Sequence, residues 1–145
     1  MITESHKFPG LSRATKFGAG LAKWTSSWVD AGTLVAVIGV EHADTIALLE
    51  VTPTDELKVK SVLWTKGMGP DVTPANPVYH PGTRRCSFVG TGPKGMALFS
   101  LAAGDPAPPK RLEPDGIDHN IGDLALSPDG RFLIFNTDRG DRPPR

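Results

Sequence analysis

The sequence predicts an all-β fold made of consecutive four-stranded antiparallel units, and three observations support this prediction. The 145 residues include 16 glycines and 14 prolines, well above the average usage of these two turn-forming residues. They are scattered between short apolar runs and are not clustered, which is typical of short strands joined by turns. The same order of strands, turns and loops also recurs along the chain, which indicates an internal repeat.

The chain begins with a polar, glycine-punctuated segment at residues 1–20. We expect one short strand in it, at residues 13–17, as a candidate closing strand for an incomplete unit at the other end of the chain. The first unit follows at residues 21–66. Its expected strands are residues 24–29, 33–38, 45–51 and 58–64.

Three of these strands differ in their apolar patterns. Residues 33–38 are apolar without alternation, so we expect this strand to be buried on both faces. A helix is the alternative for residues 45–51, but a run of seven bounded by a loop and Pro53 favours a strand. Residues 58–64 begin by alternating charged and apolar side chains, which indicates a half-exposed outer strand.

The second unit spans residues 67–115 and the third spans residues 116–145. After a loop at residues 66–77, the second unit has expected strands at residues 78–80, 84–89, 96–101 and 110–112, with a second loop at residues 90–95. Prolines just before the last of these strands fit a sheet edge, where a missing backbone donor costs little. The third unit contains strands at residues 124–126 and 132–135 and then stops, so it is a partial unit.

The turn between these last two strands carries the clearest local signal, Ser127-Pro128-Asp129-Gly130-Arg131. Gly tolerates positive φ, Asp bonds to the backbone that follows it, and Pro presets φ for the corner. Gly32 and Thr83 stand at equivalent positions, with spacings of 51 and 47 residues to the next turn. Such a period, with four strands per unit, is typical of β-propeller blades.

This turn and the apolar strand that follows it, ending at Asn136-Thr137-Asp138-Arg139, resemble the blade repeat of TolB-type, WD-repeat-like β-propellers. Residues 80–88 resemble a degenerate copy. The resemblance implies about two and a half blades over residues 21–145, whereas complete propellers have four to eight. We therefore expect an incomplete ring, with exposed apolar faces and edges.

Three explanations of the incomplete ring stay open. The ring is completed by a second copy or a protein partner, the chain belongs to a longer propeller, or the N-terminal segment caps an open stack. The first is the preferred prediction.

Composition narrows the classes of partner. Lys plus Arg and Asp plus Glu are both 16, giving a formal net charge of +0, so no global field attracts nucleic acid or anionic membranes. We expect no nucleic-acid partner. No apolar run approaches the roughly 18 residues of a membrane helix, and the N-terminus lacks a signal-peptide pattern. The single cysteine, Cys86, excludes an internal disulfide and reads as a buried, inert thiol.

Polar residues in loops form the candidate ligand- or partner-binding site. In a propeller these loops lie on one face of the ring. The candidates are His42, Asp118, His119, Asn120, Asp138 and Arg139. Solvated loops and turn capping are the alternative reading. Because no HxH or HExxH spacing occurs, neither a metal nor a cofactor is predicted.

Catalytic residues are not predicted either, because the sequence has no Gly-x-Ser-x-Gly nucleophile elbow. We therefore predict a non-enzymatic binding and assembly module that docks on itself or on a partner protein. Two alternatives stay open. One is a segment of a propeller-containing lyase or peptidase, and the other is a sugar-binding propeller, with Trp24, Trp28 or Trp64 as an aromatic shelf. His80, at the head of a turn, is expected to make a structural hydrogen bond.

Overall fold

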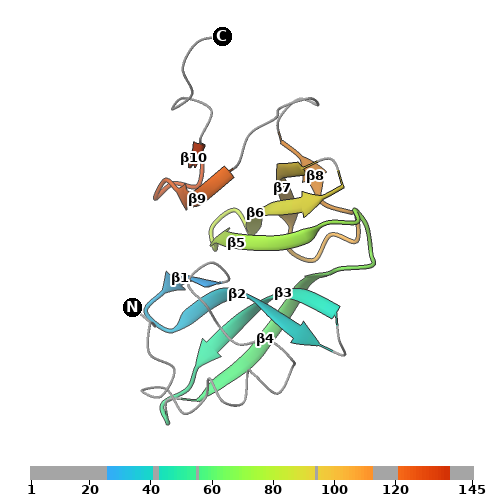
Figure 1. The fold of residues 1–145 in the computed structure, drawn as a ribbon. Coiled ribbons are helices and arrows are strands. Elements are labelled where there is room, and N and C mark those ends of the chain that lie inside the picture. The colour runs from blue at the N-terminus through green and yellow to red at the C-terminus, as the bar shows by residue number, and fades with distance from the viewer. Residues whose placement is uncertain (1–25, 41–42, 55, 94, 113–120, 138–145) are drawn as a thin grey trace.

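A computed structural model describes residues 26–40, 43–54, 56–93, 95–112 and 121–137 (Figure 1). These residues form ten strands in three antiparallel sheets, which confirms the all-β class. The described sheets do not close into a ring. Among the same residues, no helix has the length and apolar character that a membrane crossing requires. The strand predicted at residues 13–17 lies outside the described residues.

The first sheet has the strand order β1-β2-β3-β4. Its strands are β1 (Ser26–Asp30), β2 (Thr33–Val40), β3 (Ala43–Val51) and β4 (Leu57–Thr65). Residues 34–38 of β2 are all buried, as the unbroken apolar run predicted. β3 is a strand and not a helix. β4 is exposed from Lys58 to Val62 and forms one edge, which confirms the predicted outer strand.

The second sheet repeats this arrangement with the order β5-β6-β7-β8. Its strands are β5 (Thr73–His80), β6 (Arg85–Gly92), β7 (Gly95–Ala102) and β8 (Lys110–Arg111). The predicted loop at residues 66–77 was therefore too long, because β5 already begins at Thr73. The prolines at 74 and 77 are tolerated because β5 is an edge strand, with an irregular register between Ala75 and Val78.

The predicted loop at residues 90–95 was also too long, because β6 and β7 pair as far as Gly92 and Gly95. Glycines in this stretch had indicated a loop, but Gly90 serves packing. A Cβ built on Gly90 would lie 2.7 Å from the Phe99 ring and 2.7 Å from Val72. Glycine is therefore needed at this position inside the strand, because the side chains of Phe99 and Val72 occupy the space that a Cβ would take.

The third sheet contains β9 (Ile121–Leu126) and β10 (Leu133–Thr137). The predicted hairpin is confirmed, with Leu126 opposite Leu133. The apolar run at residues 132–135 predicts a strand that is buried only where a neighbouring strand covers it, and Phe132, Ile134 and Phe135 are 60%, 62% and 41% exposed. The physical reason is that β10 pairs with β9 alone among the described strands.

The three sheets pack face to face through two apolar layers. Between the first and second sheets, Phe88 stacks against Trp64 of the first sheet and Phe99 of its own, with ring centroids 5.4 and 5.5 Å apart. Between the second and third sheets, Val89 and Leu98 pack with Ile121. The second sheet is thus covered on both faces, and the first strands β1, β5 and β9 lie next to one another (Figure 1).

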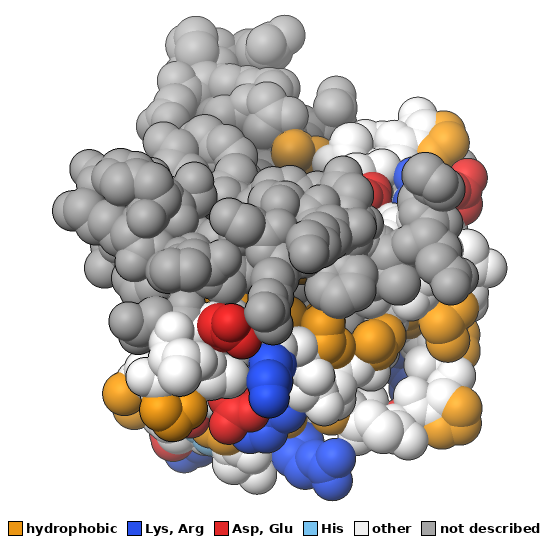
Figure 2. All heavy atoms as spheres, turned by 90° about the horizontal axis from the view of Figure 1, so that it is seen from below, with side chains coloured by type: hydrophobic (Ala, Val, Ile, Leu, Met, Phe, Trp, Pro, Cys, Tyr) orange, Lys and Arg blue, Asp and Glu red, His pale blue; other side chains and the backbone are white. Residues whose placement is uncertain are grey.

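The outer face of the first sheet carries another buried cluster, which includes Leu34, Ala36, Ile38 and Leu49. Seen from this side, charged side chains of both signs lie close together among hydrophobic ones, with no field of a single sign among the coloured residues (Figure 2). This mixture matches the formal net charge of +0.

Candidate functional site

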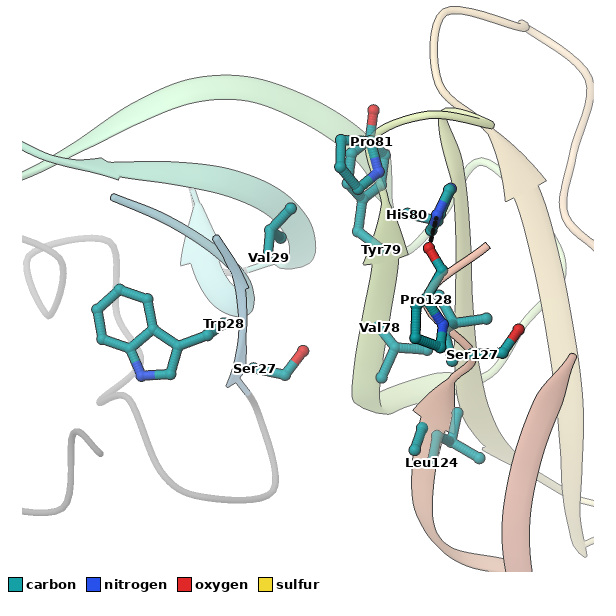
Figure 3. A pocket seen from close by; sticks show the side chains of 12 residues that line it. Ser27, Trp28, Val29, Val78, Tyr79, His80, Pro81, Leu124, Ser127 and Pro128 are labelled. Atoms are coloured by element: carbon teal, nitrogen blue, oxygen red, sulfur yellow. Dashed lines mark hydrogen bonds between the residues drawn. The ribbon is translucent and has the colours of Figure 1, made fainter. Parts of the chain in front are cut away.

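A cavity of about 430 Å³ lies where the first strands of the three sheets meet (Figure 3). Its walls come from residues 27–29 of β1, residues 78–81 at the end of β5, and residues 124–128 of β9 and the following turn. Both apolar side chains and hydroxyl groups line it. Each wall belongs to a different sheet, so the shape of this cavity depends on how the three sheets are joined.

Two side-chain hydrogen bonds fix the spacing of the three first strands. The hydroxyl of Ser27 donates to the carbonyl of Pro77 over 2.7 Å, joining the first and second sheets. The amide of Asn76 donates to the carbonyl of Gly122 over 3.0 Å, joining the second and third. Asn76 adopts a φ of 51°, a left-handed conformation in which Asn is enriched.

The turn that begins at Ser127 borders the cavity and is held by its own side chains. The Ser127 hydroxyl donates to Asp129 Oδ1 over 2.7 Å and accepts the backbone N–H of Phe132 over 2.9 Å. Asp129 Oδ1 also accepts the backbone N–H of Arg131 over 3.0 Å. These donors, first Ser127 and then Arg131, hold the pKa of the Asp129 carboxyl below its ordinary value.

The corresponding turn of the first sheet uses its aspartate in the same way. Asp30 Oδ1 accepts the backbone N–H of Gly32 over 2.9 Å. This hydrogen bond holds the pKa of the Asp30 carboxyl below its ordinary value. Both carboxylates therefore serve their own turns, which is a structural role.

His80 connects the turns of the second and third sheets. Its Nδ1 accepts the backbone N–H of Thr83 over 3.0 Å, so the ring proton is on Nε2. Nε2 then donates to the carbonyl of Pro128 over 2.9 Å, the dashed line in Figure 3. Both ring nitrogens are used, which confirms the predicted structural hydrogen bond.

His80, Ser127 and Asp129 have the composition of a catalytic triad but not its arrangement. A triad needs the serine hydroxyl to donate to an imidazole that a carboxylate orients. Here the serine donates to the aspartate, and the imidazole donates to a backbone carbonyl. This cluster therefore has no activated nucleophile, and its chemistry is that of a structural junction.

The six residues predicted as a binding site all lie outside the described residues. They are His42, Asp118, His119, Asn120, Asp138 and Arg139. The structure accordingly neither brings them together nor separates them, and they stay a prediction. Within the part of the chain that the structure describes, no group of three or more His, Cys, Asp or Glu side chains could hold a metal ion.

The tryptophans divide into two environments. Trp64 is 3% exposed, stacks on Phe88, and donates from Nε1 to the carbonyl of Gly69 over 2.8 Å. Trp64 therefore packs between the first and second sheets. Trp28 is 42% exposed and lies at the cavity wall (Figure 3), whereas Trp24 lies outside the described residues.

Sequence reasoning missed the cavity and the hydrogen bonds of Ser27 and Asn76 that join the sheets. The equivalent turns at Gly32, Thr83 and Gly130 were a usable signal, because equivalent turns of stacked repeats lie side by side. Comparison with protein-family models, curated proteins and solved structures finds no match for this chain.

Proposed function

We propose that this chain is a non-enzymatic assembly module of propeller-type blades, whose third sheet docks on a second copy of the chain. The observation that carries the proposal is β10, an apolar strand that is exposed at a sheet edge. Exposed apolar edges are templates for pairing with another chain.

Comparison with its counterparts within the chain shows what β10 lacks. β2 and β6 each follow the first strand of their sheet after an equivalent turn, as β10 does. Both have a neighbouring strand on each side. Their central residues, such as Val35 and Phe88, are 0% exposed. β10 has the same apolar character but one neighbour among the described strands, and Ile134 is 62% exposed.

The packing of the sheets supports the blade interpretation. Each sheet is an antiparallel meander in chain order, the sheets pack face to face, and their first strands are neighbours. Propellers place the first strands of successive blades around their axis in this way. The third sheet has two strands where the first and second have four, so it has the size of half a blade.

A second copy suits this half blade. Antiparallel pairing of β10 with β10 of a two-fold-related copy gives a four-stranded sheet, the size of the first and second sheets. Residues 133–137 carry no charge that would oppose the pairing. Head-to-tail assembly is less favoured, because it needs the outer face of the first sheet, where Leu34 and Ile38 are already 1% and 0% exposed.

Sedimentation equilibrium over a range of protein concentrations tests this proposal. We expect the mass to rise from one to two chains, and Ile134→Lys to shift the equilibrium to the monomer. Val62→Lys is the matched control, because Val62 is 54% exposed on the outer strand of the first sheet. A folded monomer at every concentration contradicts the second copy as occupant. Binding to a different protein, lost in Ile134→Lys, would then identify a partner in its place.

A further inference from the structure

We propose that a small cavity between the second and third sheets binds a tetrahedral oxyanion, such as phosphate or sulfate. The cavity has a volume of about 90 Å³ and lies beneath the turns that His80 joins. Its polar lining includes Arg85, Ser87, Ser100 and Arg131. This inference is independent of the proposed docking of β10.

The wall on the second sheet changes from apolar to hydrogen-bonding within a few residues. Val89 and Leu98 are opposite one another and pack toward the third sheet. Ser87 lies two residues before Val89, and Ser100 lies two residues after Leu98, so both are on this same face. Ser87 and Ser100 are also opposite one another and are 6% and 4% exposed. The two hydroxyls therefore add hydrogen-bonding groups to a face that is apolar at Val89 and Leu98.

The groups in this wall can donate hydrogen bonds to a ligand. Arg85 Nη2 donates to Ser100 Oγ over 3.1 Å. Since Ser100 Oγ already accepts that bond, its own proton can point to a ligand. The guanidinium of Arg85 carries further N–H donors, and a guanidinium has no acceptor atoms. Such a cluster of donors suits an acceptor, and an oxyanion suits it best because charge-assisted bonds are the strong ones.

The charges of the lining residues also favour an anionic ligand. Arg85 and Arg131 line the cavity, and no carboxylate is among the described lining residues. The nearby Asp129 carboxylate accepts from Ser127 and from the backbone of Arg131. By contrast, the cavity of about 350 Å³ between the first and second sheets is lined by Asp30 together with Lys60 and Arg84.

The size of the cavity limits the ligand. The cavity has a volume of about 90 Å³, several times the least space that holds one water molecule. It has room for a single phosphate or sulfate group, whereas a nucleotide or a peptide would extend out of it. The ligand is therefore the free anion or the oxyanion end of a small molecule.

Calorimetric titration of the full chain with inorganic phosphate tests the proposal, with sulfate, acetate and chloride compared at equal ionic strength. We expect heat from phosphate and sulfate, a rise in melting temperature, and no effect of chloride. A response to acetate equal to that of phosphate would contradict a tetrahedral site.

Variants place the binding in this cavity. Arg85→Gln and Ser100→Ala are expected to weaken phosphate affinity on the order of tenfold or more, the usual effect of losing a hydrogen bond to a charged group. Arg84→Gln is the matched control, because this neighbouring arginine lines the other cavity. Melting curves without phosphate show that each variant is folded. Unchanged affinity in folded Arg85→Gln, or no phosphate binding by the natural chain, overturns the proposal.

Discussion

His80 Nε2 donates a hydrogen bond to the carbonyl of Pro128 over 2.9 Å, and this bond joins the turns of two successive sheets. The imidazole is oriented by the backbone N–H of Thr83, 3.0 Å from Nδ1. The two partners are 48 residues apart in sequence, so a side chain at the end of β5 contacts the turn of the third sheet. Asn76 adds a second link, to Gly122.

His80→Ala is expected to lower the free energy of unfolding by about 1–2 kcal/mol, since it leaves the Pro128 carbonyl and the Thr83 N–H without this partner. Amide exchange should increase most in β9 and β10, which the bond holds against the second sheet. Denaturant titration and hydrogen exchange measure the two effects. Thr83→Ala keeps the backbone donor and should change neither. Equal protection of β9 and β10 in His80→Ala and the natural chain would contradict this role.

Gly130→Ala is expected to destabilise the protein by about 1–3 kcal/mol. Gly130 has a φ of 74°, and a Cβ there would lie 2.6 Å from His80 Nδ1. Gly32→Ala is the matched control at the equivalent turn of the first sheet, where no atom lies within 4 Å of the added Cβ. We expect the control to be near neutral. Thermal unfolding of the two variants measures the difference. Equal losses of stability would contradict a specific role of the positive φ and of the contact with His80 at Gly130.

These two glycines also show what the sequence could predict. Gly32 and Gly130 both lie in turns, as the sequence predicted, but only Gly130 has a positive φ and only Gly130 lies against His80. Apolar runs predicted that β2, β3 and β7 exist. Strand ends were missed where prolines or glycines normally break strands, because edge position and close packing make both acceptable.

Burial was harder to predict than strand position, because it depends on neighbours. Residues 33–38 and 132–135 are both apolar runs, yet the first is enclosed and most of the second is exposed. The central cavity was missed for the same reason, since it exists only when three distant strands come together. The polar loop residues that composition singled out lie outside the described residues.

Low pH should remove the contribution that the Asp129 carboxylate makes to the stability of the folded protein. Its hydrogen bonds lower its pKa in the folded protein, so the unfolded chain takes up the proton first as the pH falls. The stabilisation is present above the ordinary aspartate pKa of about 3.9 and is lost as the pH falls through the lowered value. Urea unfolding of Asp129→Asn and the natural chain should differ more near neutral pH than near pH ~3. The same difference at both values would contradict this account.

Cys86 offers a direct measurement of the interface between the first and second sheets. The thiol is 0% exposed, and burial raises its pKa to about 12. A disulfide reagent therefore reacts only after this core opens, and labelling should be orders of magnitude slower than in denaturant.

Phe88→Leu removes the ring that stacks on Trp64 across this interface, so it should accelerate labelling of Cys86. Leu133→Ala, which truncates the other apolar layer, should accelerate labelling less, because Cys86 faces the first sheet. Rapid labelling of the natural chain would show that this thiol is accessible. A larger effect of Leu133→Ala would show that the core around Cys86 depends more on the third sheet than on the aromatic stack.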